Sequence, residues 1–160
     1  MKPRANQPQG RFRRVLLATD GSENATRAAR AAIDLAKTYH AELVVVTAIP
    51  APTALMRTTN PAFPQSTAAL GEYYTYARAE AAAVLEAAVE LAKEQGVAAR
   101  RLVLDQPASP VEAIVRCAER EKADLIVVGT RGLSGFRKLL IGSVSRGVVN
   151  HATCPVLVVR

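Results

Sequence analysis

The 160-residue sequence has no tryptophan, and aromatic residues make up only 4% of it. Aliphatic side chains must therefore fill any core, as they do in parallel sheets that are buried on both faces. The sequence also lacks the aromatic pair of RNA-recognition motifs and an arginine-rich recognition helix. These absences argue against specific nucleic-acid binding as a main function.

Cysteine is also scarce. The two cysteines, Cys117 and Cys154, are too few for a disulfide framework. Neither has the spacing to a second cysteine or to a histidine that zinc sites show. We expect both to be small buried hydrophobic residues.

Long apolar runs are absent as well. No stretch reaches the ~18 residues that a membrane-spanning helix needs, and no apolar leader follows the charged amino terminus. We therefore expect a soluble, cytoplasmic protein without a membrane partner. Much of the net charge of +7 lies in the first fourteen residues, so residues 1–12 are expected to form a disordered basic tail and residues 13–160 a single domain.

What the sequence does contain is a regular alternation of short aliphatic runs and helical patterns. Ser22 and the pair Ser109-Pro110 are typical helix starts, and Gly96 is typical of a helix end. The proline-containing segment 50–66 is expected to be irregular. The apolar face of the last helix is expected to consist of Val144, Val148, Val149 and Ala152, and residues 119–122, which include Glu121, are expected to be a solvated helix end. This alternation predicts an α/β fold with a parallel sheet, with strands at 15–18, 42–49, 101–104, 124–128 and 156–159 and helices at 23–39, 67–95, 110–122 and 143–152.

A glycine-rich segment follows the fourth predicted strand. Gly129, Gly132, Gly142 and Ser143 fill the pattern G-x2-G-x9-G-[ST], and Gly142 lies where the last helical pattern begins. Glycine lets a backbone approach a ligand closely, and the first amides of a helix lack internal partners and lie at the positive end of its dipole. Ser145 adds a second hydroxyl nearby. The segment therefore predicts a phosphate site.

Two other phosphate motifs do not fit. A Walker A loop needs Lys-Ser or Lys-Thr after its second glycine, but Gly147 is followed by two valines. A dinucleotide fingerprint should follow the first strand, where the sequence has only one glycine, Gly21. Both motifs are excluded.

The glycine spacing and the order of the flanking strands resemble the universal stress proteins, specifically the branch that binds ATP. The resemblance runs from about Arg14 to Arg160. It implies a single-domain, doubly wound, Rossmann-like sheet of five parallel strands in the order 3-2-1-4-5, with helices on both faces. In such a sheet the ligand binds outside the carboxyl ends of strands one and four, where the strand order reverses. Asp20 and Gly129 lie at those two ends.

The resemblance also implies a nucleotide site and a homodimer. The dimer would form through the last strand, Val156 to Val159. Mg²⁺ would be the metal on the phosphates, with no protein metal ligand and no catalytic residue assigned. The phosphates would be held by the glycine-rich segment, that is by Gly129, Thr130, Arg131, Gly132, Gly142, Ser143, Val144 and Ser145. Adenosine would lie near the ends of the first, second and fourth strands, beside Ala18, Thr19, Asp20, Ala48 and Val128.

Several residues have a second interpretation. Asp20 could accept hydrogen bonds from adenosine, or form a local turn or cap. Ala48 is smaller than the valine expected there, which would loosen adenine packing. Tyr73, Tyr74 and Tyr76 could stack on a base, but packing within a helix is the favoured interpretation.

Three functions remain open. The favoured one is an ATP-binding regulatory homodimer that acts in stress response. The second is a dimeric interaction protein of the same fold that does not use nucleotide. The third is an enzyme, either a slow or self-phosphorylating ATPase or an adenylate-forming relative, although no histidine or glutamate lies near the glycines as an evident base.

Overall fold

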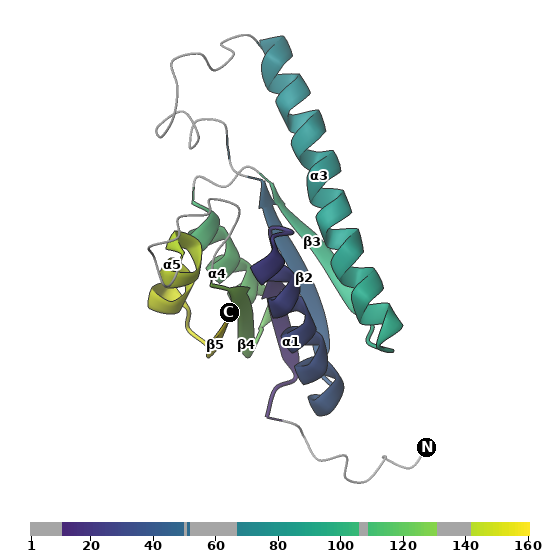
Figure 1. The fold of residues 1–160 in the computed structure, drawn as a ribbon. Helices are drawn as coiled ribbons and strands as arrows, with labels where there is room; N and C mark the ends of the chain where they lie inside the picture. The colour runs from purple at the N-terminus through teal and green to yellow at the C-terminus, as the bar shows by residue number, and fades with distance from the viewer. Residues whose placement is uncertain (1–10, 50, 52–66, 106–108, 131–141) are drawn as a thin grey trace, which may run out of the picture.

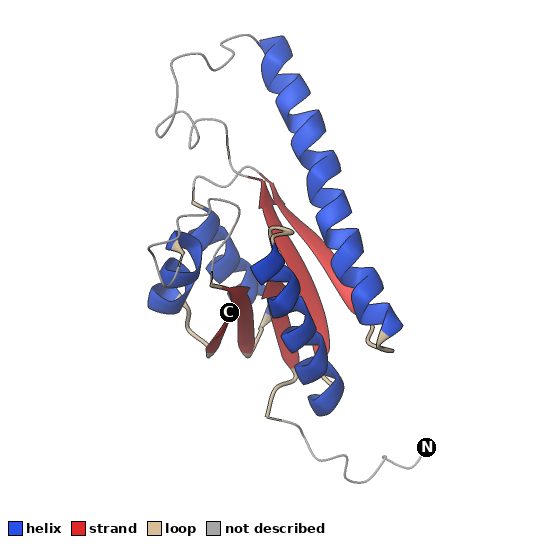
Figure 2. Cartoon of the chain, in the orientation of Figure 1, coloured by secondary structure: helices blue, strands red, loops and turns tan. Residues whose placement is uncertain are grey.

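The predicted aliphatic runs become the five strands of one parallel sheet, in the order β3-β2-β1-β4-β5 (Figures 1 and 2). The computed structural model describes residues 11–49, 51, 67–105, 109–130 and 142–160. The predicted fold class and strand order are confirmed. The strands are β1 (Arg14–Ala18), β2 (Glu42–Ile49), β3 (Ala99–Asp105), β4 (Leu125–Gly129) and β5 (Val156–Val159).

Helices cover both faces of this sheet (Figure 2). On one face, small residues of α1 and α3 pack on the odd-numbered side chains of the central strands, such as Leu17 and Val45. On the other face, α4 and α5 pack on the even-numbered ones, such as Leu16 and Val44. The helices are α1 (Glu23–Tyr39), α3 (Thr67–Glu94), α4 (Pro110–Glu121) and α5 (Ser143–His151).

The helix starts and ends follow the local signals. The Ser22 hydroxyl accepts the Ala25 amide at 3.2 Å, and the Ser109 hydroxyl accepts the Glu112 amide at 3.3 Å. Gly96 follows α3 with φ +73°, a conformation that favours glycine. The bounds of β2 and α1 agree with the prediction to within a residue.

The predictions were less accurate for residues near the edges of the molecule. β3 is longer than predicted, because its first residues and Asp105 pair with β2 although most of them face solvent. In α5, Val144 and Val149 are exposed rather than part of a buried stripe, since this short helix buries only Ser145 and Val148. The structure thus contradicts the predicted apolar face of α5.

Aromatic and cysteine positions also differ in part. Tyr76 is 65% exposed and donates its hydroxyl to Glu80, so it does not pack inside the helix layer. The amino-terminal part of α3 extends beyond the sheet (Figure 1), and Tyr76 belongs to the amino-terminal half of this helix. Cys117 is buried as predicted, whereas Cys154 is only half-buried. Burial raises the pKa of both thiols.

Charged residues tie the amino ends of the strands together. The two Asp124 carboxylate oxygens accept the main-chain amides of Arg13 and Arg14, at 2.8 and 3.1 Å. Glu121, predicted to be part of a solvated helix end, instead has a side chain that is only 14% exposed and pairs with Arg100. That hydrogen bond and the nearby guanidinium groups hold the pKa of Glu121 below its usual value.

Candidate functional site

The carboxyl ends of β1 and β4 form the part of the sheet where the strand order reverses. The two strands are direct neighbours, with Ala18 paired to Val128. After β1 the chain passes into α1 on one face, and α5 lies on the opposite face. Divergence of this kind opens a crevice outside the sheet, which is the usual ligand position in doubly wound folds.

Three predicted adenosine-facing residues lie on a single face of the sheet. Ala18, Ala48 and Val128 all pack against the cluster shared with α4 and α5. Val128 is 3% exposed, while the two alanines are half-buried. The structure therefore brings together three small apolar side chains from three strands at the same edge.

The loop after β1 is held by its own hydrogen bonds. The Thr19 amide donates to the Val46 carbonyl at 2.9 Å, which extends the β1–β2 pairing by one residue. One Asp20 carboxylate oxygen, Oδ1, accepts the Ser22 amide at 3.0 Å. Gly21 between them has φ +77°. The turn interpretation of Asp20 is thus confirmed, and because a carboxylate accepts several hydrogen bonds, this turn does not conflict with contact to a ligand.

Gly129 ends β4 directly beneath the first turn of α1. A Cβ atom at this position would lie 2.9 Å from the Asn24 carbonyl carbon, 3.0 Å from its oxygen and 3.1 Å from the Ala25 nitrogen. All three are backbone atoms, which cannot move aside as a flexible side chain could. The missing side chain of Gly129 therefore lets α1 approach the sheet, a role that the phosphate interpretation of this glycine did not anticipate.

Thr130 links β4 to both neighbouring elements. Its amide donates to the Val159 carbonyl of β5 at 2.8 Å, and its carbonyl accepts the Gly142 amide at 2.5 Å. The Ser145 hydroxyl lies 3.1 Å from the Thr130 carbonyl and 3.1 Å from the Gly142 carbonyl. Thr130 and Ser145 are both buried. The sequence grouped Thr130, Gly142 and Ser145 as phosphate ligands, and the structure shows them in contact with one another.

The amino terminus of α5 lies next to this junction. Its N-cap, Gly142, has no side chain with which to cap the helix, so the first amides lack the side-chain acceptor that most helices have. Ser143 and Val144 beside them are exposed. Amides at the positive end of a helix dipole suit an anion. Arg131 and Gly132, the remaining predicted ligands, lie outside the described residues.

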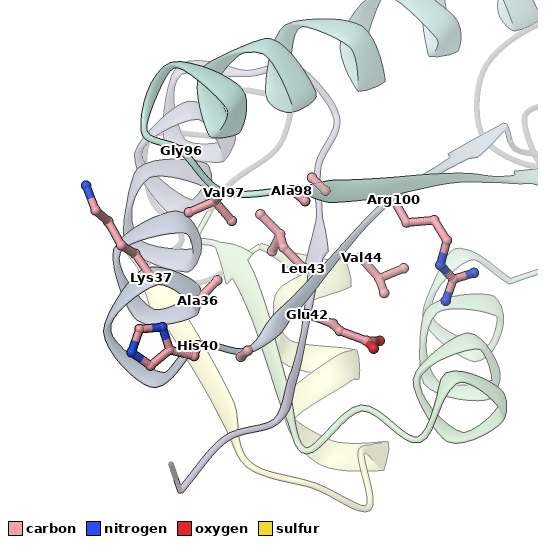
Figure 3. Close-up of a pocket in the computed structure, with 12 residues that line it drawn as sticks. Ala36, Lys37, His40, Glu42, Leu43, Val44, Gly96, Val97, Ala98 and Arg100 are labelled. Atoms are coloured by element: carbon pink, nitrogen blue, oxygen red, sulfur yellow. The ribbon is translucent and has the colours of Figure 1, made fainter. Parts of the chain in front are cut away.

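A separate hollow lies at the opposite end of the sheet, between α1 and the amino ends of β2 and β3 (Figure 3). The side chains of Lys37 and His40 point to one side of it, and those of Glu42 and Arg100 to the other. Glu42 and Arg100 are also engaged in ion pairs. Its charged groups therefore do not converge on a common point, and this hollow has no evident ligand chemistry.

Neither histidine lies at the carboxyl ends of β1 and β4 or at the start of α5. His40 is the left-handed C-cap of α1, and His151 is the exposed last residue of α5. In the described parts of the chain no group of three metal-ligating side chains comes together. Likewise, none of the described helices is both long and apolar enough to cross a bilayer.

Comparison with known proteins gives one consistent family. The model of the universal stress protein family matches residues 11–160. A universal stress protein of Thermus aquaticus is 42% identical over 150 residues, which cover 93% of this chain and 99% of the relative.

Solved structures that are similar over nearly the whole chain include two complexes with a nucleotide. One is a universal stress protein in complex with cAMP, 29% identical with a TM-score of 0.67, covering 93% of this chain and 97% of the other. The second is the universal stress protein of Archaeoglobus fulgidus in complex with dAMP, 25% identical with a TM-score of 0.67, covering 93% and 98%. With the family model matching almost its full length, the chain belongs to the universal stress protein family.

Proposed function

We propose that this protein binds ATP, with Mg²⁺ on the phosphates, in the crevice between the ends of β1 and β4. The observation that carries the proposal is the position of the α5 amino terminus, whose uncapped amides are held against the end of β4 through Thr130. Phosphate binds at the α5 amides and at the exposed Ser143, with Arg131 and Gly132 as further ligands that the sequence pattern supplies. Ser145 and Val144 complete that segment.

Adenosine binds beside the small side chains of Ala18, Ala48 and Val128, and the Asp20 loop lies at the end of the same strand as Ala18. The two related structures in complex with cAMP and dAMP support an adenine nucleotide as the ligand class. ATP is proposed over a monophosphate because the first α5 amides, the exposed Ser143 hydroxyl and the sequence-supplied Arg131 offer more donors than one phosphate needs.

The first test is the identity of the nucleotide that the purified protein retains. We expect chromatography of the heat-released fraction to show ATP. Added ATP with Mg²⁺ should also raise the melting temperature, because a ligand at 100 times its Kd stabilises by ~2.7 kcal/mol. A protein that retains no nucleotide and shows no shift with ATP, cAMP or AMP would contradict the proposal.

Gly142 allows a matched pair of variants. Its φ of −68° is accessible to any residue, and Asp and Asn are both favourable N-caps of similar size. G142D places a negative charge at the proposed phosphate position, whereas G142N does not. We expect G142D to lose the ATP-induced shift and G142N to keep more of it; equal shifts in the two variants would place the phosphates elsewhere.

We further infer that the protein is a cytoplasmic homodimer joined through β5, and that it regulates in response to nucleotide rather than turning it over. β5 is an edge strand made only of valine and leucine, with Leu157 exposed. The other edge, β3, has charged residues in ion pairs: Arg100, Arg101 and Asp105. Charged side chains discourage pairing at a sheet edge, and their absence permits it.

Slow hydrolysis is part of this proposal. Rapid phosphoryl transfer needs a positioned water or acceptor and groups that strengthen in the transition state, and both histidines lie at the carboxyl ends of helices, away from the proposed phosphate position. We expect steady-state ATPase activity well below ~1 per second. A faster rate that is lost in D20A would establish an enzyme.

A further inference from the structure

The carbonyl of Thr130 is a junction between two elements that are distant in sequence. It accepts the Gly142 amide at 2.5 Å and lies 3.1 Å from the Ser145 hydroxyl. Residues 131–141 separate Thr130 from Gly142, so covalent geometry alone does not place the start of α5 against the end of β4. These hydrogen bonds do so, and we call Thr130, Gly142 and Ser145 the clasp.

The Ser145 hydroxyl is committed to this junction. Ser145 is 4% exposed, and its hydroxyl lies within 3.1 Å of two main-chain carbonyls, those of Thr130 and Gly142. A serine hydroxyl has a single proton to donate. When that proton points at a carbonyl, the hydroxyl has only lone pairs left, and these repel a phosphate oxygen.

We propose that Ser145 is a positioning residue for nucleotide binding and not a phosphate ligand. Its hydroxyl holds the α5 amino terminus at the end of β4, where the uncapped helix amides meet the phosphates. This inference rests on the proposed function and revises one residue of it. The direct hydroxyl contact to phosphate in this segment is assigned to the exposed Ser143 instead.

The test compares S145A with V148A. S145A removes the hydroxyl and leaves the helix otherwise intact. Val148 is fully buried in the same helix and makes only apolar contacts in the α4–α5 cluster, so V148A lowers stability without touching the clasp. Calorimetry with ATP and, separately, with adenosine measures the phosphate-dependent part of binding. Hydrogen exchange at the Gly142 amide, without nucleotide, measures the clasp itself.

We expect S145A to raise the Kd for ATP about five- to tenfold, the effect of one net hydrogen bond, and to leave the Kd for adenosine within about twofold. Exchange at Gly142 should be faster in S145A than in V148A. V148A should lower the melting temperature and leave the ratio of the two Kd values unchanged.

Three results would overturn the inference: an unchanged ATP affinity in S145A, an equal loss for ATP and adenosine, or unchanged exchange at Gly142. The last of these, combined with weaker ATP binding, would restore Ser145 as a direct ligand. If the wild-type protein binds neither ATP nor adenosine, the proposed function fails and the positioning role fails with it. If the wild type binds both and S145A binds both with wild-type affinity, only the positioning role fails.

Discussion

At the scale of single residues, Gly129 is under a packing constraint that can be tested without any ligand. Because backbone atoms of Asn24 and Ala25 lie 2.9 to 3.1 Å from the position of an added Cβ, G129A must push α1 away from the sheet. We expect a loss of about 1–3 kcal/mol in the free energy of unfolding, as for other overpacked sites, measured by urea denaturation.

Gly71 gives the matched control, since an added Cβ there meets nothing within 4 Å and the residue lies inside α3. Alanine is the better helix former, so G71A should gain about 0.5–1 kcal/mol. Equal effects of the two substitutions would show that α1 does not lie as close to Gly129 as described.

Glu121 predicts a pH dependence with a defined sign. Its carboxyl pKa is lowered from 4.5, mainly by the hydrogen bond from Arg100. Above pH 4.5 the carboxylate is charged in both folded and unfolded chains, and the pair stabilises the fold in full. As the pH falls below 4.5, the unfolded chain takes up its proton first, and the stabilisation is lost until the folded carboxyl is protonated too.

We therefore expect E121Q to lower the melting temperature at pH 7, and the difference from wild type to shrink as the pH falls below 4.5. Glu90 is a suitable control, because its pair with Lys93 lies on an exposed helix surface where ion pairs contribute little. A constant difference between E121Q and wild type from pH 7 to pH 3 would show that the pair does not lower this pKa.

Which atoms a residue contacts was harder to predict than which residues gather at the site. The glycine and serine pattern grouped residues that the structure brings into contact between β4 and α5, and their role in phosphate binding stays a prediction. It could not show that Ser145 turns toward two carbonyls, because serine in the first turn of a helix can face inward or outward. Asp20 was similar: its two interpretations are compatible, and only coordinates show that the turn forms.

At the scale of elements, the contact between α4 and α5 depends on another glycine. A Cβ on Gly147 would lie 2.6 Å from Val111 Cγ2 and 2.9 Å from Cγ1. Glycine inside a helix costs about 1 kcal/mol relative to alanine, so close packing must offset that loss here. G147A should destabilise the wild-type protein despite its better helix propensity.

The atoms that an added Cβ on Gly147 would meet belong to the Val111 side chain. The prediction can therefore be tested with a double-mutant cycle. V111A removes the two methyl groups that would clash, so G147A should cost less, or even stabilise, in the V111A background. We expect a coupling of about 0.5 kcal/mol or more between the two substitutions by urea unfolding. Additive effects would show that the helices do not meet at these residues.

Buried elements were predicted well and surface elements less well. β2 and α1 agree with the sequence pattern because β2 is an inner strand and α1 covers the central strands, where each aliphatic residue must be buried. β3 was predicted too short because this edge strand continues through the exposed Arg100 and Asp105, which carry no apolar signal. For α5 the error was the opposite one, because Val144 and Val149 were predicted to be buried and are exposed. This short helix buries only Ser145 and Val148.

At the scale of the whole molecule, the two edges of the sheet provide a test of the proposed dimer. Leu157 on β5 and Val103 on β3 are both exposed apolar residues of edge strands, at 36% and 43%. L157K and V103K therefore make the same chemical change at opposite edges. If chains pair through β5, L157K should shift the sedimentation of micromolar protein from dimer to monomer, because it places two positive charges close together across the interface.

V103K should sediment as the wild type does. A dimer that survives L157K but dissociates with V103K would place the interface at β3, and a wild-type monomer at micromolar concentration would remove the dimer altogether. Circular dichroism of each variant would verify that the sheet is intact.

The packing of Gly129 beneath α1 also bears on how glycine motifs are compared among related chains. A relative with the same contact between its first helix and fourth strand would have to keep glycine at the corresponding position even after losing every trace of nucleotide binding. That glycine alone is therefore a marker of architecture. Information about ligand binding comes instead from other positions of the motif, such as the helix cap Gly142, whose φ of −68° any residue can adopt.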